Sequence, residues 1–168
     1  RLGLIRADDG TGRLDPNAQT WIVIHGWNSS PETVDNIGDA LAAGGLNRQV
    51  LEFDWSSAAA AGNVVTAALR VPDIAPWIYN KLNRWGLSTD RINLVGHSLG
   101  GYMAGEIARN TNGGVNRIIA LDPATTDVAG LNISGVDFAR DSMYSVAFLG
   151  SNFATPSAAF TADETIRT

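Results

Sequence analysis

The residues with the clearest chemical meaning surround one serine in the middle of the chain. They read Gly96-His97-Ser98-Leu99-Gly100. This G-x-S-x-G pattern is typical of a sharp turn between a strand and a helix, on which a nucleophilic serine is held in a strained backbone conformation. Side chains at the two outer positions would collide with the adjoining strand and helix, so glycine is expected there. The pattern predicts that Ser98 is a nucleophile.

A nucleophilic serine of this kind also needs an oxyanion hole and an acid. Leu99 would begin the helix after the turn, so its backbone N–H can point at a developing oxyanion. Trp27 follows an apolar run and Gly26, which is where a second backbone donor is expected. Asp122 ends another apolar run 24 residues after Ser98. The acid follows the nucleophile in such chains, so Asp122 is the predicted acid.

The catalytic base is the part that the sequence does not supply. The chain has two histidines, His25 and His97, and both precede Ser98, whereas a hydrolase of this type keeps its base downstream. We expect His25 to order the loop before Trp27 by hydrogen bonding. We expect His97 to point away from Ser98 into the surrounding packing. The catalytic histidine is therefore expected in a C-terminal part that these residues lack.

Alternating strands and helices position these residues. Apolar runs predict buried strands at residues 20–24, 49–53, 91–95, 117–121 and 143–149. Helices are predicted at residues 31–43, 65–85 and 99–109, with a connection of small residues at 56–62. Ser30 is the predicted N-cap of the first helix, and Pro72 and Pro76 are expected to kink or split the second. This α/β pattern predicts a mostly parallel central sheet with helices on both faces, whose ligands bind beyond the carboxyl ends of the strands.

Composition narrows the classes of partner. A chain of 168 residues with 45% hydrophobic content suits a single domain, residues 1–168. The net charge of −5 argues against nucleic acid and anionic membranes as partners. Zero cysteines exclude disulfides and thiolate metal sites. The acidic run at residues 8–15 lacks the spacing of a calcium loop and predicts a turn, so we expect no metal and no cofactor. No leader and no transmembrane segment are evident.

Four stretches of the chain resemble the neutral lipase family of pancreatic, hepatic and lipoprotein lipases. They are Ile24-His25-Gly26-Trp27, Phe53-Asp54-Trp55, the serine motif, and Leu121-Asp122-Pro123-Ala124. Their order and spacing are similar to those of the family over about two-thirds of the chain. The resemblance implies an α/β-hydrolase fold, with Ser98 as nucleophile, Asp122 as acid, and the Trp27 and Leu99 amides as the oxyanion hole.

The resemblance also implies the substrate and the location. A lipid ester, either triacylglycerol or phospholipid, would be hydrolysed through an acyl-enzyme on Ser98, with transient contact to a lipid interface, by a secreted or extracellular protein. The animal enzymes brace a lid with disulfides, so the absence of cysteine suggests a bacterial relative or a form without a lid. Two alternatives stay open: a general esterase or thioesterase, and a non-catalytic lipid-binding or structural protein on the same scaffold. The oligomeric state is not indicated.

Overall fold

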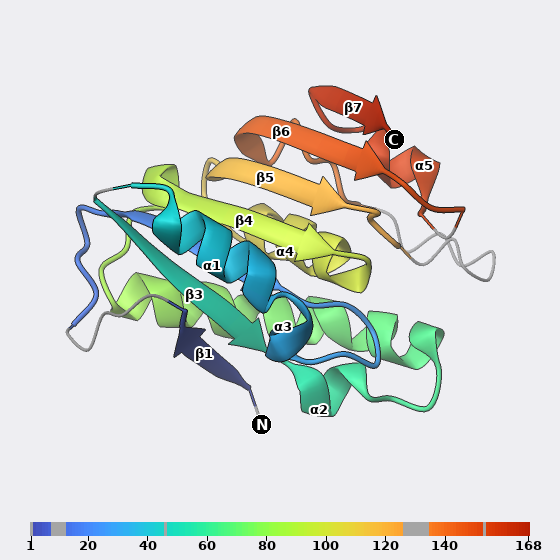
Figure 1. Ribbon diagram of the computed structural model, residues 1–168, viewed down its shortest axis with the longest axis horizontal. Coiled ribbons are helices and arrows are strands. Elements are labelled where there is room, and N and C mark those ends of the chain that lie inside the picture. Colours follow the sequence, from blue (N-terminus) through green and yellow to red (C-terminus); the bar gives the residue numbers. More distant parts are fainter. Residues whose placement is uncertain (1, 8–12, 46, 126–134, 153) are drawn as a thin grey trace.

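A computed structural model shows a twisted sheet with helices packed against it (Figure 1). The structure describes residues 2–7, 13–45, 47–125, 135–152 and 154–168, so most of the turn predicted in the acidic run, at residues 8–12, lies outside it. The strands are β1 (Gly3–Arg6), β2 (Gln19–Ile24), β3 (Arg48–Asp54), β4 (Ile92–His97), β5 (Val115–Leu121), β6 (Ser142–Leu149) and β7 (Glu164–Arg167). The helices are α1 (Asp35–Ala43), α2 (Ser56–Ala59), α3 (Val64–Arg84), α4 (Leu99–Arg109) and α5 (Pro156–Ala159).

The sheet is parallel except at one edge. Its strands pair in the order β1-β3-β2-β4-β5-β6-β7, and β1 alone runs antiparallel, against β3. In this register Ile24 lies beside Gly96, and His97 lies beside Leu121. The carboxyl ends of β2, β4 and β5 therefore meet at the same end of the sheet. The predicted mostly parallel sheet is confirmed, and the Ser98 and Asp122 turns leave adjacent strands.

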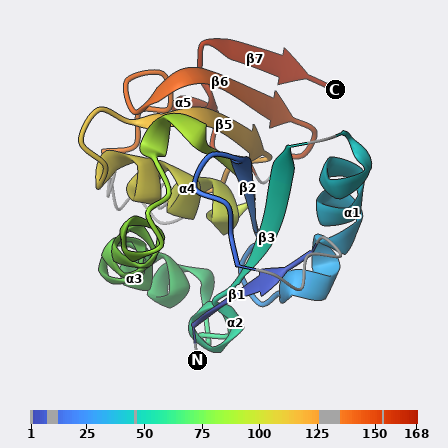
Figure 2. The same cartoon turned by 90° about the vertical axis from the view of Figure 1, so that its left-hand side faces the viewer.

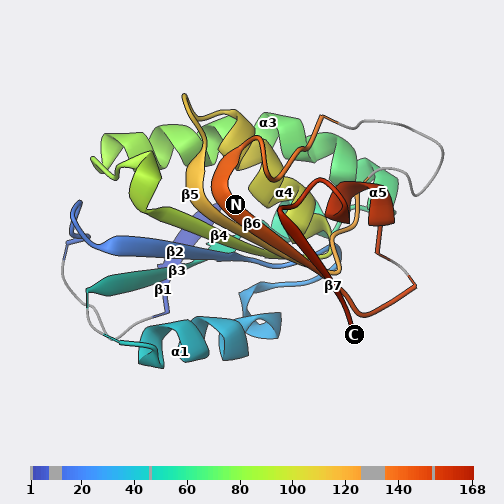
Figure 3. The same cartoon turned by 90° about the horizontal axis from the view of Figure 1, so that it is seen from above.

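Helices cover both faces of the sheet, as predicted. Figure 3 shows α1 on one face and α3 with α4 on the other, and Figure 2 shows the same separation from the side. The larger core lies between the sheet and α3 and α4, where Trp55, Tyr102 and Phe53 are the bulkiest fully buried residues. A smaller apolar cluster lies beneath α1 and contains Trp21, Val23, Val34, Val50 and Val95.

The helix α3 is not split by its prolines. It runs without interruption from Val64 to Arg84 and contains both Pro72 and Pro76, so of the two expected outcomes, a kink or a split, the split is wrong. Each proline removes one backbone donor, but the helix buries a long apolar stripe against the core, which compensates for the lost bonds. The buried positions are Ala67, Ala68, Val71, Ile74, Ala75, Ile78 and Leu82. Among the helices that the structure describes, none has the length and apolarity needed to cross a membrane.

The first helix begins later than the capping pattern predicts. Residues 31–33 form a short 3₁₀ turn, and α1 starts only at Asp35. The Ser30 side chain makes no capping bond, because its hydroxyl donates instead to the Glu32 carboxylate. A side-chain cap is present on α3, where the Asn63 side chain accepts a hydrogen bond from the Thr66 N–H at 2.8 Å.

Candidate active site

Ser98 makes the whole turn between β4 and α4. The strand ends at His97 and the helix begins at Leu99. The Ser98 backbone has φ 55° and ψ −123°, a conformation that a residue with a side chain adopts only when its surroundings enforce it. The Ser98 N–H donates to the Leu121 carbonyl at 2.9 Å, and the Ser98 carbonyl accepts from the Ala124 N–H at 3.0 Å. This is the strained, braced serine that the motif predicts.

The two motif glycines are required by backbone crowding. A Cβ atom on Gly96 would lie 2.2 Å from the Gly100 carbonyl oxygen. A Cβ atom on Gly100 would lie 2.2 Å from the Ile24 carbonyl oxygen. Both obstacles are main-chain atoms, so neither can rotate aside as a flexible side chain would. The predicted reason for glycine at both positions is confirmed, and the absence of a side chain at Gly100 lets the start of α4 lie close against the end of β2.

Gly26 places the loop after β2 directly against the serine. A Cβ atom on Gly26 would lie 3.0 Å from Ser98 Cβ and 3.5 Å from Ser98 Oγ. The next N–H along this loop belongs to Trp27, and the first N–H of α4 belongs to Leu99. Within the described residues, the structure records no protein acceptor for either N–H. An oxyanion hole requires two backbone donors beside the nucleophile, so these two N–H groups are the candidate donors.

His25 is fully buried and holds this loop in place, as expected. Its Nδ1 lies 3.0 Å from the Gly26 carbonyl oxygen, and its Nε2 accepts a hydrogen bond from the Trp55 N–H at 3.3 Å. These partners place the single imidazole proton on Nδ1. Burial lowers the pKa of the His25 imidazole, which favours this neutral form. Since both ring nitrogens have protein partners, His25 is not placed to take the Ser98 proton.

Trp55 supports the loop from the neighbouring strand exit. Its indole Nε1–H donates to the His25 carbonyl at 2.9 Å. Its ring stacks on the imidazole with centroids 5.6 Å apart and an interplanar angle of 20°. Reasoning from residue types does not identify Trp55 as a site residue, because a tryptophan after an apolar strand is most simply core. The only signal was its place in the Phe53-Asp54-Trp55 stretch of the family resemblance.

Asp122 leaves β5 in a second sharp turn. Its backbone φ is 45°, and its N–H donates to the Phe148 carbonyl at 2.8 Å. Its carboxylate Oδ1 accepts hydrogen bonds from the Gly150 N–H at 2.6 Å and the Ser151 N–H at 3.0 Å. These bonds fix one carboxylate oxygen and therefore the orientation of the group. Nothing in the sequence marks Gly150 and Ser151 as partners, because they follow a different strand.

The expectation for His97 is wrong in one respect. Its side chain is exposed rather than packed. His97 is two residues after Val95, so it points to the face of the sheet that α1 covers. However, α1 packs mainly on β2 and β3 and leaves the His97 side chain uncovered. The imidazole therefore meets solvent.

A polar cavity of about 690 Å³ adjoins the Asp122 turn. Gly150 and Ser151, which donate to the Asp122 carboxylate, are part of its wall. The remaining lining residues are Leu149, Asn152, Ala154, Pro156, Arg167 and Thr168. In the part of the chain that the structure describes, no three histidine, cysteine or acidic side chains gather closely enough to hold a metal ion.

Comparison with known proteins identifies the family. The family model described as Lipase matches residues 12–134, more than half of the chain. The chain belongs to the lipase family. Among curated relatives of this lipase-family chain, lipoprotein lipase of Neovison vison is 33% identical over 114 residues, which are 64% of this chain and 24% of that protein. Pancreatic triacylglycerol lipase of Myocastor coypus is 31% identical over 130 residues, 72% of this chain and 28% of that protein.

Solved structures confirm the α/β-hydrolase fold of this lipase-family chain. Esterase PE8 superposes with a TM-score of 0.64 at 14% identity and covers 99% of this chain and 87% of its own. MGS-M1, an α/β hydrolase from a Medee basin deep-sea metagenome library, superposes with a TM-score of 0.60 at 12% identity. The match covers 100% of this chain and 81% of the MGS-M1 chain. The chain spans about a quarter of the length of the curated relatives it matches.

Proposed function

We propose that this chain carries the nucleophile, the acid and the oxyanion hole of a carboxylic ester hydrolase that acts on lipid esters. The observation that supports this most strongly is the contact between the oxyanion loop and the serine. A Cβ at Gly26 would lie 3.5 Å from Ser98 Oγ, so the loop that carries the Trp27 amide packs closely against the serine. A strained serine next to two backbone donors suits acyl transfer.

In the proposed first step, Ser98 Oγ attacks the carbonyl carbon of the ester while a base takes the hydroxyl proton. The carbonyl oxygen becomes an oxyanion, which accepts hydrogen bonds from the Trp27 and Leu99 N–H groups. Collapse of this intermediate breaks the bond to the alcohol, which leaves with the proton from the base. Water then attacks the acyl-enzyme while the same base takes its proton. The carboxylic acid is released, and the proton returns to Ser98 Oγ.

The base in this proposal is a histidine outside these 168 residues. Both ring nitrogens of His25 already have partners, the Gly26 carbonyl and the Trp55 N–H. His97 is exposed to solvent at the end of β4. Asp122 would accept a hydrogen bond from the incoming imidazole and stabilise its protonated form. The Asp122 carboxylate is already oriented by Gly150 and Ser151.

The proposed substrate class is a triacylglycerol or a phospholipid, on the strength of the lipase-family match. Trp27 supports contact with a lipid interface during turnover, because this residue of the loop after β2 is 40% exposed while its Nε1–H donates to the Ala61 carbonyl at 3.1 Å. A tryptophan with one wet and one apolar side suits such a boundary. We further propose an extracellular location, from the similarity to lipoprotein and pancreatic lipases.

Hydrolysis assays on the full-length protein test this proposal. Emulsified triacylglycerol, phospholipid vesicles, a soluble short-chain ester and an acyl thioester should be compared, each with the Ser98→Ala variant. The proposal requires release of fatty acid from at least one of the two lipids and its loss in Ser98→Ala. Activity confined to the soluble ester or the thioester would instead identify a general esterase or thioesterase. No hydrolysis of any substrate would favour a lipid-binding or structural role.

A further inference from the structure

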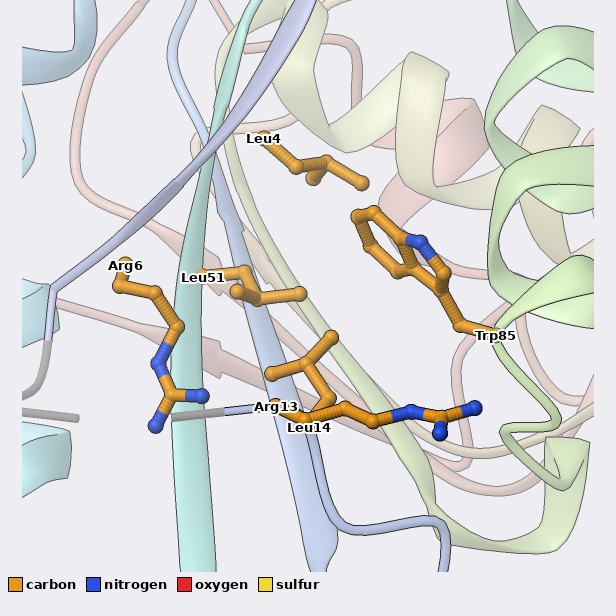
Figure 4. Close-up of a pocket in the computed structure, with 6 residues that line it drawn as sticks. All are labelled: Leu4, Arg6, Arg13, Leu14, Leu51 and Trp85. Carbon is orange, nitrogen blue, oxygen red and sulfur yellow. The ribbon is translucent and has the colours of Figure 1, made fainter. Parts of the chain in front are cut away.

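A second cavity, at the β1 edge of the sheet, has the chemistry of a binding site for an amphiphilic anion. Its volume is about 290 Å³. Figure 4 shows the side chains that surround it. They are Leu4, Arg6, Arg13, Leu14, Leu51 and Trp85. We propose that this cavity binds a single-chain aliphatic carboxylate.

The cavity is separate from the candidate active site. Ser98 and Asp122 follow the carboxyl ends of β4 and β5. Leu14 instead precedes the amino end of β2, and Trp85 follows α3 on the way to the amino end of β4. The Arg91 guanidinium ties these two amino ends together by donating to the Asn17 carbonyl at 2.7 Å. A ligand here would therefore leave Ser98 accessible.

The inner wall of the cavity is apolar. Leu51 is 2% exposed and belongs to the larger core. Leu4, Leu14 and Trp85 are only partly buried and pack against the same core. Figure 4 shows these four side chains around one common space. Such a wall favours an aliphatic chain, since contact removes apolar surface of both partners from water.

Cations border this apolar wall. Leu4 and Arg6 are two residues apart on β1, so their side chains lie on the same face of the sheet. Arg6 is paired with Leu51 of β3. Arg13 contributes a second guanidinium to the lining. The Lys81 ammonium lies 5.2 Å from the centroid of the Trp85 ring. Two of the 12 basic residues of an acidic chain thus line one small cavity, a third lies over the ring of the lining residue Trp85, and none of the six described lining residues is acidic.

The guanidinium groups favour an anionic head group, and the cavity volume limits the length of the aliphatic chain. A guanidinium can bind a carboxylate through two parallel hydrogen bonds, which gives the anionic end a defined place. A volume of about 290 Å³ lies at the low end of ligand cavities, which span roughly 300–1,000 Å³, so a short chain such as octanoate fits better than a whole lipid. Binding of such an anion does not depend on the proposed hydrolysis.

Nuclear magnetic resonance of the tryptophan indole N–H groups tests the proposal. The Trp85 resonance is assigned with Trp85→Phe, and octanoate is titrated against octanol as the uncharged analogue. We expect a saturable shift of the Trp85 signal with octanoate at least tenfold tighter than with octanol. Arg13→Gln should weaken octanoate binding about tenfold, because it removes a charged donor. The control Arg84→Gln removes an exposed neighbouring charge that does not line the cavity and should change affinity less than twofold.

Several outcomes would overturn the proposal. One is the absence of a saturable shift at Trp85. Another is equal affinity for octanoate and octanol, which would indicate apolar partitioning without recognition of the anion. Equal losses in Arg13→Gln and Arg84→Gln would indicate general charge attraction rather than a site. None of these outcomes bears on the proposed role of Ser98, because the reactivity of that serine is measured in a separate experiment.

Discussion

The imidazole of His25 lies against the indole of Trp55 and accepts a hydrogen bond from the Trp55 main chain. The ring centroids are 5.6 Å apart, and the distance from the Trp55 nitrogen to Nε2 is 3.3 Å. The two residues leave adjacent parallel strands, β2 and β3. Their contact therefore joins two strand exits and fixes the loop that presents Gly26 and Trp27 to Ser98.

Replacing His25 should impair the oxyanion hole more than substrate binding. His25→Phe keeps a ring to stack on Trp55 but removes the donor to the Gly26 carbonyl and the acceptor for the Trp55 N–H. Complete loss of one oxyanion donor costs about 10²–10³ in kcat, so a loosened loop should lower kcat roughly 10-fold to 100-fold with KM within about twofold. Steady-state kinetics of the full-length protein on a soluble ester measure both. A folded variant with unchanged kcat would contradict this role of His25.

Gly100→Ala should destabilise the fold strongly. The added methyl group would lie 2.2 Å from the Ile24 carbonyl oxygen, so β2 and α4 would have to separate. Overpacking of this kind costs about 1–3 kcal/mol or more. Urea unfolding followed by circular dichroism measures the loss. The matched control is Gly62→Ala, because a Cβ at Gly62 has no atom within 4 Å. Equal stability of the two variants would show that the crowding at Gly100 is unimportant.

Glu52 should make the protein less stable as pH rises. It is 7% exposed on β3 beneath α1. Burial is the main cause that raises its pKa from 4.5 to about 7, and the nearby Asp35 carboxylate is the second. The folded state therefore favours the protonated acid. Its stabilising contribution is complete below pH 4.5 and is lost as pH rises to about 7. The loss should be on the order of 2 kcal/mol.

Unfolding free energies at pH 5 and pH 8 check this prediction. Glu52→Gln keeps the shape of the protonated acid, so it should be more stable than the parent at pH 8 and nearly equal at pH 5. Glu164→Gln, an exposed position on β7, should leave the difference between the two pH values unchanged. A parent protein whose stability did not fall relative to Glu52→Gln between these values would refute the prediction.

Asp122→Asn should reduce turnover without unfolding the protein. An asparagine oxygen can still accept the Gly150 and Ser151 bonds, so the turn is preserved, but the charge that stabilises a protonated histidine is lost. In another serine hydrolase the equivalent change lowers kcat about 10⁴-fold, and a similar order is expected here. Ester hydrolysis by the full-length variant measures it. Asp90→Asn, at an exposed position in the turn before β4, provides the charge-matched control and should retain full activity.

The sequence predicted the parts of the site that depend on local pattern. Ser98 with its two glycines, the position of Trp27 and the end of β5 at Asp122 all follow from short motifs next to apolar strands. Interactions between distant segments were not predictable. The bonds from Gly150 and Ser151 to Asp122 span 28 and 29 residues and depend on the β5 and β6 register. Nothing in residue type or spacing signals them.

The fold shows the same division. All five predicted strands form, because each is rich in apolar residues even where a polar residue such as Glu52 or Asn93 interrupts the run. The short edge strands β1 and β7 have four residues each and few buried positions, so they carry little pattern. Pro72 and Pro76 locally disfavour a continuous α3, but its buried stripe outweighs them. Ser30 is a suitable cap by type, yet its hydroxyl donates to the carboxylate of Glu32, two residues further on. In both cases an interaction beyond the local preference decides the structure.

Covalent capture of the serine tests the central claim most directly. The full-length protein is treated with an alkyl fluorophosphonate, and the modified residue is located by peptide mass spectrometry. The account predicts one adduct per chain on Ser98, none in Ser98→Ala, and an unchanged adduct in Ser88→Ala, whose serine is exposed elsewhere. A folded full-length protein that forms no adduct, or forms it on another serine, would contradict the assignment of Ser98 as the nucleophile.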